Sequence, residues 1–312
     1  MFEQKTSGST GLPKLIHITR AQMVISAELT VSALNLSSND IALVCVDTAY
    51  IAGKMMLVRA FEYQMNILII EPSSNPLAHV NTPFHFAAMV PMQIENTLNS
   101  TTSKEKLAHC KAILIGGAPV NIKLSKQLEK LQTPIYATYG MTETVSHIAL
   151  QKLSSPSENY FTTVGDVTIS TNNNDQLIIN GAITNNKELI TNDRVRLLSP
   201  NTFIWMGRSD NVVNSGGVKF QLEDVENSIA LLFNDLNIYN NFFAAKIKDE
   251  YLGDKIALYI EIENRLLPPN FKDVLKHRMA KHQFPREIIL AKKFITTGSG
   301  KIDKLATINN QK

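Results

Sequence analysis

The sequence predicts an α/β protein with a large N-terminal domain, built mainly on parallel sheets with an added antiparallel β region, and a small α+β C-terminal domain. From about residue 19 to 140, segments of helical periodicity alternate with short, continuously apolar runs, a pattern typical of buried parallel strands. After residue 160, short strands surround turn-forming residues, which indicates antiparallel pairing. A new apolar helix pattern follows Gly207-Arg208 and marks the second domain.

The first domain is expected over residues 1–207. We expect its helices over residues 23–34, 54–63, 92–98 and 122–131, and its parallel strands over residues 41–46, 67–70, 112–115 and 134–137. The antiparallel region is predicted to contain strands near residues 167–170, 176–180, 188–190, 194–198 and 202–206. The turn Asn172-Asn173-Asn174-Asp175 joins the first two of these strands.

The second domain is expected over residues 208–312. Its first helix is indicated by apolar residues at helical spacing, namely Leu222, Val225, Ile229, Leu232, Phe233 and Leu236. Strands over residues 242–247 and 255–263, a helix over residues 271–281 and a strand over residues 287–291 follow, before a glycine-containing tail. This order is typical of a small α+β unit.

Composition limits the class of protein. The chain has 312 residues, 44% of them hydrophobic and 19% charged, as in folded globular proteins. The net charge of +3 argues against nucleic-acid binding, and no apolar run approaches the roughly 20 residues of a membrane span. The N-terminus lacks the apolar core of a secretory signal, and Cys45 and Cys110 lie in or beside apolar segments. We therefore expect a cytoplasmic protein with reduced cysteines.

The strongest chemical signal is Thr6-Ser7-Gly8-Ser9-Thr10-Gly11-Leu12-Pro13-Lys14. Glycines let backbone N–H groups approach an anion, hydroxyls donate to phosphate oxygens, and the lysine supplies positive charge. The spacing differs from that of a Walker A loop. The alternative interpretation is a flexible hydrophilic N-terminus, which the offset of Pro13 and Lys14 before an apolar segment disfavours.

A second signal, Tyr139-Gly140-Met141-Thr142-Glu143, follows a predicted buried strand, where α/β sheets bind ligands. Thr142 is suited to donate to a phosphate, Glu143 to hold Mg²⁺, and Tyr139 to stack on a purine. Alone, this pentapeptide is also compatible with any strand-to-helix turn.

Two further segments lie nearer the C-terminus. The first runs from Gly207-Arg208-Ser209-Asp210 through Asn214-Ser215-Gly216-Gly217-Val218-Lys219. The second is Gly298-Ser299-Gly300-Lys301, whose lysine would by itself be read as a solvated charge.

In this order, the four segments resemble the acyl-adenylate-forming superfamily, which contains acyl- and aryl-CoA ligases, luciferases and peptide-synthetase adenylation domains. The resemblance covers nearly the whole chain. It implies an enzyme that activates a carboxylic acid with ATP and Mg²⁺ as an acyl-adenylate, and then transfers the acyl group to coenzyme A. It also implies that the small C-terminal domain is mobile, and it leaves the oligomeric state open, a homodimer included.

The resemblance assigns residues to the nucleotide. The loop from Thr6 to Lys14 would close over the β- and γ-phosphates, with Thr6, Ser7, Gly8, Ser9, Thr10, Gly11 and Lys14 as its binding residues. Gly116-Gly117-Ala118-Pro119 would contact adenine, with Tyr139 on the other face of the base, and Gly140 would also belong to the nucleotide site. Thr142 would contact the α-phosphate and Glu143 would bind Mg²⁺.

The resemblance also assigns the ribose contacts and the moving parts. Asp193 would hold the ribose hydroxyls, with Arg208 as a second contact. Asp210 would be the hinge, and Lys301 would contact the substrate carboxylate and the α-phosphate during adenylation. The loop with Gly216, Gly217 and Lys219 would then admit the pantetheine arm of coenzyme A.

Three departures from the family pattern alter these expectations. Asn192 replaces the central glycine of Thr-Gly-Asp, which we expect to matter little. Tyr50-Ile51-Ala52-Gly53 replaces a His-x-x-Gly pocket motif, which changes the acyl pocket or its gate. The phosphate loop begins at residue 6, where the family has a long preceding segment, so we expect either a shortened lineage or a truncated chain.

Within the superfamily, residues 139–150 and 211–219 are most similar to o-succinylbenzoate–CoA ligases of menaquinone biosynthesis. That substrate has a second carboxylate that needs a cation or several donors. The candidates for its pocket are Tyr50, Gly53, Arg59, Ser146 and His147.

Each of these interpretations has an alternative. Arg59 would otherwise be a surface or ion-paired helix residue, and His147 a packed histidine bonded to the backbone. The function alternatives are another aryl- or fatty-acyl-CoA ligase, transfer of the acyl group to a carrier protein, and a non-catalytic nucleotide-binding homologue.

Overall fold

The fold was determined as a computed structural model that describes residues 1–5, 15–262, 267–296 and 302–311. The described residues divide into two compact units. The first unit contains those of Met1–Asn173, Leu177–Thr191 and Arg196–Ile204, and the second contains those of Asn174–Gln176, Asn192–Val195 and Trp205–Lys312. Each unit is described by itself.

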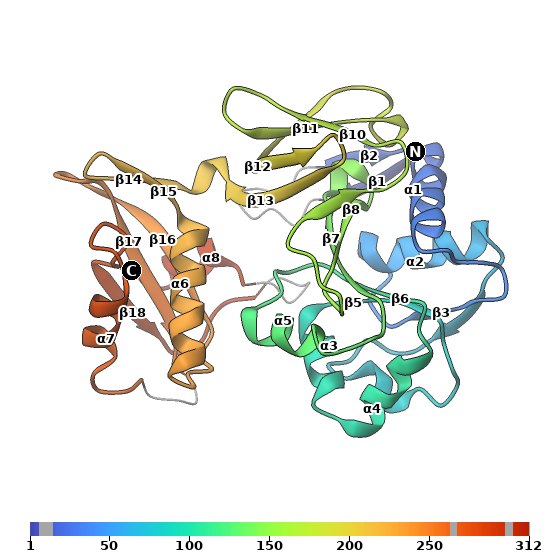
Figure 1. Cartoon of the computed structure of the whole chain (residues 1–312), viewed down its shortest axis with the longest axis horizontal. Helices are drawn as coiled ribbons and strands as arrows, with labels where there is room; N and C mark the ends of the chain where they lie inside the picture. Colours follow the sequence, from blue (N-terminus) through green and yellow to red (C-terminus); the bar gives the residue numbers. More distant parts are fainter. Residues whose placement is uncertain (6–14, 263–266, 297–301, 312) are drawn as a thin grey trace. The chain divides into compact units, whose positions relative to one another are not determined.

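A large mixed sheet forms the framework of the first unit, and parts of its strands β11, β12 and β13 are counted in the second unit (Figure 1). Its eleven strands follow the hydrogen-bonding order β10-β11-β12-β13-β9-β8-β7-β6-β5-β3-β4. Five of them are parallel: β4 (Asn66–Ile69), β3 (Ile41–Val44), β5 (Phe86–Met89), β6 (Ala112–Ile115) and β7 (Ile135–Gly140). The other strands are β8 (His147–Lys152), β9 (Phe161–Thr163), β10 (Thr168–Thr171), β11 (Gln176–Asn180), β12 (Leu189–Ser199) and β13 (Thr202–Arg208). The pairs β7–β8, β8–β9, β9–β13 and β10–β11 are antiparallel.

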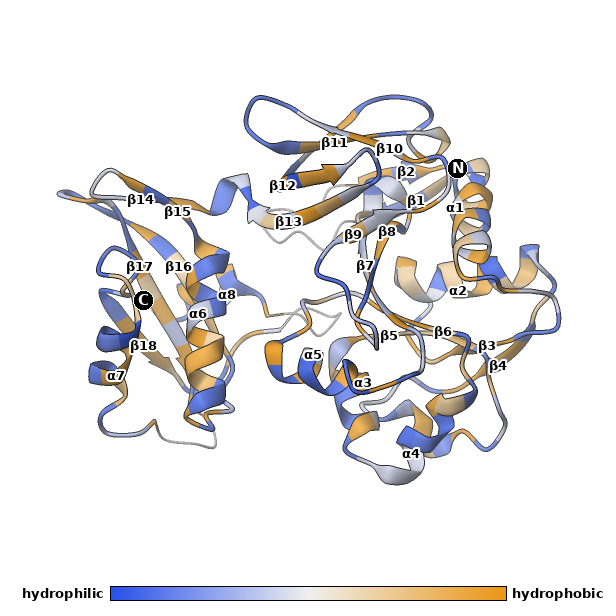
Figure 2. Cartoon of the chain, in the orientation of Figure 1, coloured by the Kyte–Doolittle hydropathy of each residue, from blue (hydrophilic) through white to orange (hydrophobic). Residues whose placement is uncertain are grey.

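Helices cover both faces of the parallel strands. Figure 1 shows α1 (Arg20–Ala33) and α2 (Ile51–Glu62) on one side, and α3 (Pro91–Leu98), α4 (Thr101–Glu105) and α5 (Ile122–Leu128) on the other. This double covering explains why β6 is buried along its whole length and why its sequence does not alternate. Figure 2 shows the same strands as largely hydrophobic.

Local sequence signals start the first helix. The Thr19 hydroxyl accepts a hydrogen bond from the N–H of Gln22 at 3.1 Å, and the Gln22 side chain accepts one from the N–H of Thr19 at 3.1 Å. This capping box satisfies two N–H groups that a helix start otherwise leaves without partners. The apolar residues of α1 then pack inward, among them Met23, Ala27 and Val31.

The N-terminal residues form a hairpin that the sequence did not predict. Strands β1 (Phe2–Lys5) and β2 (Leu15–Ile18) pair antiparallel, with Phe2 opposite Ile18. The hydroxyl-rich segment Thr6–Lys14 lies between them and outside the described residues.

The second unit contains a smaller sheet with strand order β15-β14-β17-β16, to which β18 adds beside β17. Its strands are β14 (Val212–Ser215), β15 (Val218–Gln221), β16 (Phe242–Asp249), β17 (Gly253–Glu261) and β18 (Glu287–Ala291). Its helices are α6 (Leu222–Asp235), α7 (Phe271–Arg278) and α8 (Lys304–Asn309). The predicted apolar face of α6 is confirmed, because Val225, Ile229 and Phe233 lie in the core of this unit.

Five short 3₁₀ helices complete the described elements: η1 (Pro76–His79), η2 (Lys106–His109), η3 (Thr142–Thr144), η4 (Ala182–Thr184) and η5 (Ser209–Asn211).

The predicted α/β class, with its parallel and antiparallel regions and its small C-terminal unit, is confirmed. The parallel and antiparallel strands belong to one continuous sheet, because β7 and β8 pair antiparallel. Among the described helices, none has the length and apolarity needed to cross a membrane.

Candidate active site

The segment after β7 turns sharply at the carboxyl end of the parallel strands. Gly140 ends β7, and a Cβ atom there would lie 2.5 Å from the Cα of His147 and closer still to the carbonyl oxygen of Ser146. Only a glycine therefore fits this close approach of two backbones. The turn η3 follows and carries Thr142 and Glu143, both half-buried. This edge of a parallel sheet is where α/β proteins bind ligands.

Thr144 and Val145 fix the shape of this turn. The hydroxyl of Thr144 accepts from the N–H of Met141 at 3.0 Å and lies 2.8 Å from the carbonyl oxygen of Ser146. Val145 has φ 64° and ψ −54°, and the N–H of Ser146 donates to the carbonyl oxygen of Thr144 at 2.6 Å. These values define a γ-turn with positive φ, which is a strained conformation, most of all for a β-branched residue. Sequence reasoning missed both residues.

One buried hydrogen-bond network joins three of the predicted pocket residues, Arg59, Ser146 and His147, to Thr30. The Arg59 side chain extends from α2 and donates from Nε to the Thr30 hydroxyl at 3.0 Å and from Nη2 to the Ser146 hydroxyl at 2.8 Å. The Thr30 hydroxyl donates to the carbonyl oxygen of Ser26 at 2.9 Å. Arg59 is only 2% exposed, so the structure does not place it on the surface.

These bonds determine the state of His147. Because the proton of Thr30 goes to Ser26, the ring Nε2 of His147, 3.3 Å from the Thr30 hydroxyl, acts as the donor. The other ring nitrogen, Nδ1, lies 3.4 Å from the Ser146 hydroxyl and accepts from it. Burial first, and then the charge of Arg59, hold the pKa of His147 well below its usual value. His147 is therefore a neutral imidazole that fixes both hydroxyls around Arg59.

Arg59 keeps unused capacity for an anion. A guanidinium has five N–H donors, and Thr30 and Ser146 accept two of them. No carboxylate of the described residues lies within 4 Å of Arg59. Burial lowers the pKa of Arg59 to about 10, which leaves it charged at neutral pH. A buried cation without a counter-ion is costly, and a bound carboxylate would remove that cost.

Tyr50 and Gly53 lie at the start of the same helix, α2. Tyr50 is the N-cap residue and is exposed, without a side-chain cap bond. A Cβ at Gly53 would lie 2.5 Å from the carbonyl oxygen of Asp47, so this glycine lets the helix pack on the preceding loop. Their roles in the acyl pocket stay predictions.

The loop Gly116-Gly117-Ala118-Pro119 follows β6 at the same edge of the sheet as η3. A Cβ at Gly116 would lie 2.7 Å from the hydroxyl of Thr138 on β7, and Gly117 has φ +85°. Both glycines are thus required by the backbone. Tyr139 is 9% exposed, and its ring packs against Phe161 and Phe203 with centroids 5.8 and 5.2 Å away. The predicted adenine contacts of Tyr139 and this loop stay predictions.

The second unit brings together Asp193, Arg208 and Asp210. Arg208 forms a bidentate pair with Asp210, from Nε to Oδ1 at 2.9 Å and from Nη2 to Oδ2 at 2.7 Å. Asp193 accepts a hydrogen bond from Nε1 of Trp205 at 3.1 Å. The Asp210 hydrogen bond, followed by the charges of Asp210, Asp193 and Glu223, raises the pKa of Arg208.

Gly216 and Gly217 form the two-residue turn between β14 and β15. Their φ angles are +60° and +83°, as the tightest hairpin turns require. Lys219 is exposed on β15. Lys301 and the segment Thr6–Lys14 lie outside the described residues, so their predicted roles remain predictions.

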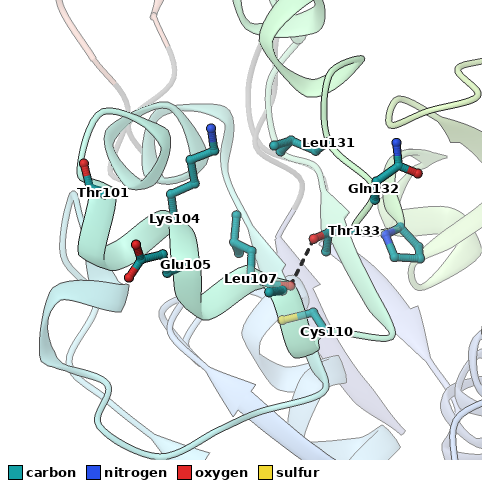
Figure 3. A pocket seen from close by; sticks show the side chains of 10 residues that line it. Thr101, Lys104, Glu105, Leu107, Cys110, Leu131, Gln132 and Thr133 are labelled. Carbon is teal, nitrogen blue, oxygen red and sulfur yellow. Dashed lines mark hydrogen bonds between the residues drawn. The ribbon is translucent and has the colours of Figure 1, made fainter.

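A different pocket, of about 540 Å³, lies near the amino ends of β6 and β7 (Figure 3). Its lining includes Lys104, Cys110 and Thr133, and the Thr133 hydroxyl donates to the carbonyl oxygen of Leu107 at 3.1 Å. None of the predicted site residues lines it. It lies at the edge of the sheet opposite to Gly116 and Thr142.

Comparison with known proteins identifies the family. Residues 4–180 match the profile of the AMP-binding enzyme family, and the chain belongs to that family. The 2-succinylbenzoate–CoA ligase of Escherichia coli is 23% identical over 316 residues, covering 96% of this chain and 67% of that enzyme. The ligase of the same name from Oceanobacillus iheyensis is 23% identical over 250 residues, covering 71% of this chain and 52% of that enzyme. The chain thus spans about half to two thirds of these relatives.

Solved structures agree with this assignment. An acyl-CoA synthetase (AMP-forming)/AMP-acid ligase II-like protein from Dyadobacter fermentans is 41% identical, with a TM-score of 0.64, over 100% of this chain and 89% of that one. O-succinylbenzoate coenzyme A synthetase from Bacillus subtilis, solved with ATP and magnesium, is 19% identical, with a TM-score of 0.83, over 98% of this chain and 69% of that one. The predicted membership of the acyl-adenylate-forming superfamily and the likeness to o-succinylbenzoate–CoA ligases are confirmed.

Proposed function

We propose that this chain catalyses the ATP-dependent ligation of o-succinylbenzoate to coenzyme A, through an acyl-adenylate. The observation that carries the proposal is the buried charge of Arg59, which has hydroxyl partners and no carboxylate partner among the described residues. A substrate with two carboxylates can place one on Arg59 while the other reacts. Curated relatives with the name 2-succinylbenzoate–CoA ligase support this choice.

The reaction would run in two steps. In the first, an oxygen of the succinyl carboxylate attacks the α-phosphorus of ATP, the bond to the bridging oxygen breaks, and pyrophosphate leaves. In the second, the deprotonated thiol of coenzyme A attacks the acyl carbonyl, and AMP leaves. Both steps bring negative groups together, so preorganised donors and cations lower their barriers.

The residues of this chain would divide the work. Thr142 would donate to the α-phosphate, and Lys301 would contact both reacting anions. The half-buried Glu143 makes no hydrogen bond or ion pair with a described residue, and a free carboxylate oxygen fits Mg²⁺. Bound there, Mg²⁺ would neutralise charge on the phosphates. Asp193 and Arg208 would hold the ribose.

The ring carboxylate of the substrate would occupy the Arg59 network. Ser146 is held by Arg59 and His147, so its oxygen is already oriented when the substrate arrives. His147 stays neutral, which avoids a second buried charge beside Arg59. The strained turn at Val145 places Ser146 in this position, three residues after Glu143.

The test is a substrate panel. Purified protein with ATP, Mg²⁺, coenzyme A and o-succinylbenzoate should yield pyrophosphate and the aryl-succinyl thioester, detected by mass spectrometry, and a Lys301→Ala variant should lose both. Pyrophosphate release only with fatty or benzoic acids would overturn the substrate. Thioester formation only on an added carrier protein would overturn the acceptor. ATP binding without turnover of any acid would support the non-catalytic alternative.

A cytoplasmic location and a homodimer remain predictions.

A further inference from the structure

The predicted hinge residue Asp210 lies in a short segment, Arg208–Val212, that we call the hinge turn. Two side chains of the second unit hold this turn from outside, and both come from elements that follow it in the sequence. Glu223 lies in the first turn of α6, and Lys246 lies on β16. Glu223 follows the Gly207–Lys219 segment in the sequence, and neither residue has a predicted role in binding a substrate.

Glu223 bonds to both sides of Asp210. Its Oε1 accepts from the backbone N–H of Arg208 at 3.3 Å and from Nδ2 of Asn211 at 2.7 Å. Gly207 makes room for it, because a Cβ at that position would lie 2.7 Å from the other carboxylate oxygen of Glu223. The carboxylate of Glu223 therefore links Arg208, two positions before Asp210, to Asn211, directly after Asp210.

Lys246 also bonds to two residues of the hinge turn, through their backbone carbonyl groups. Its Nζ donates to the carbonyl oxygen of Asp210 and, at 3.1 Å, to that of Val212. No carboxylate of the described residues lies within 4 Å of Lys246. The lysine charge is directed at the hinge backbone, in contrast to Lys248 two residues along the same strand, which pairs with Asp254 at 2.8 Å.

We propose that Lys246 and Glu223 are positioning residues that clamp the hinge turn in one conformation and thereby set the balance between the two half-reactions. A change in the backbone torsions of Asp210 moves Arg208 relative to Asn211 and Val212. Glu223 cannot keep both of its bonds through such a change, and neither can Lys246. The clamp must open for the turn to rotate, and its strength fixes how often it does.

The clamp also controls Arg208. While the turn keeps this conformation, Asp210 holds the guanidinium of Arg208 in a bidentate pair. A rotation at Asp210 moves the carboxylate away and frees Arg208 for another anionic or hydroxyl partner. The state of the hinge would therefore be coupled to the predicted ribose contact. This consequence rests on the proposed function, whereas the clamp itself rests only on the contacts.

The test compares Lys246→Met with Lys248→Met, which removes a lysine from the same strand without touching the hinge. Hydrogen exchange, read by mass spectrometry in peptides covering residues 208–213, reports the opening of the turn. Loss of the two lysine bonds should speed exchange there by about three- to tenfold, since a hydrogen bond contributes a modest net free energy. Lys248→Met should leave that peptide unchanged, and Lys246→Arg should restore most of the protection.

The second readout is the ratio of the two half-reactions, measured in single turnovers as pyrophosphate release and as thioester formation from preformed acyl-adenylate. Lys246→Met should change this ratio by about three- to tenfold, and Lys248→Met should not. Equal slowing of both half-reactions, or unchanged exchange at the hinge, would overturn the proposal. If the wild-type protein forms no adenylate with any acid, the proposed function fails, and the exchange measurement still decides on the clamp.

Discussion

Arg59 and Arg208 carry the same guanidinium group in opposite surroundings. Arg59 is fully buried, has only hydroxyl partners, and its pKa falls to about 10 because of burial. Arg208 is partly exposed, faces Asp210, Asp193 and Glu223, and its pKa is raised by these carboxylates. The guanidinium of Arg59 has no carboxylate partner among the described residues, whereas the guanidinium of Arg208 is paired with Asp210.

The largest effect that separates the two arginines is expected at Arg59. Substituting Arg59→Leu should raise the KM for o-succinylbenzoate by about 10- to 150-fold, because a hydrogen bond to a charged group contributes roughly 1.5–3 kcal/mol. The KM for 4-oxo-4-phenylbutanoate, which lacks the ring carboxylate, should change little. Steady-state kinetics with both acids measures this difference. Equal changes for the two acids would show that Arg59 is not the carboxylate site.

The second prediction concerns the neutral histidine beside Arg59. The pKa of His147 is depressed in the folded protein, so the unfolded chain binds the proton first as the pH falls below about 6.5. The free energy of unfolding should then decrease by up to about 1.4 kcal/mol per pH unit, whereas stability is fully present above that pH.

Denaturant titrations between pH 8 and 5 would measure this slope. A His147→Gln variant should lose it, and substitution of the exposed His109 by Gln should keep it. The same slope in the His147→Gln variant would contradict the buried neutral state of His147.

The third prediction tests the strain that orients Ser146 toward Arg59. Val145→Ala removes buried methyl groups and keeps a Cβ at positive φ, whereas Val145→Gly removes the strain as well. The glycine variant should therefore be more stable than the alanine variant by about 1 kcal/mol, whereas glycine normally makes a folded protein less stable than alanine does. Thermal or chemical unfolding of the two variants measures this difference in stability. An alanine variant at least as stable as the glycine variant would show that the turn is unstrained.

The smallest effect is expected at Arg208. Asp210→Asn breaks the bidentate pair, but both side chains are about one third exposed, with 29% and 36% of their surfaces accessible. Solvent screens such pairs, so the loss of stability should stay below about 1 kcal/mol. Chemical unfolding measures it. A much larger loss would mean that the pair is a fixed structural element and not a releasable one.

The sequence predicted what depends on spacing along the chain. The parallel strands over residues 112–115 and 134–137 and the helix that contains Val225 and Ile229 are found where their periodicity placed them. Strand β5 was missed, since residues 86–89 follow a proline-containing stretch that has no clear pattern. The sequence does not predict the pairing of β1 with β2, because the two strands are only four residues long and flank the hydroxyl-rich segment Thr6–Lys14.

The sequence named candidate residues for the site, but it did not predict the hydrogen bonds between them. Arg59 and Ser146 were candidates from the resemblance, but Thr30 bonds to Arg59 across 29 positions, which requires the packing of α1 on α2. The sequence signal for this contact is that Thr30, a hydroxyl residue, lies on the apolar side of the helix α1. The positive φ of Val145 runs against its residue type, and the bonds of Lys246 to the hinge depend on a strand 34 to 36 positions away.

We propose that this chain joins a diacid to coenzyme A because Arg59 holds the second carboxylate. The most direct measurement is a competition in one tube, with equal amounts of o-succinylbenzoate and 4-oxo-4-phenylbutanoate, ATP, Mg²⁺ and coenzyme A, in which mass spectrometry gives the ratio of the two thioesters. The account predicts that the diacid product exceeds the monoacid product by about 10- to 150-fold, and that Arg59→Leu brings the ratio close to one. A ratio near one in the wild-type protein, or the same large ratio in the variant, would contradict it.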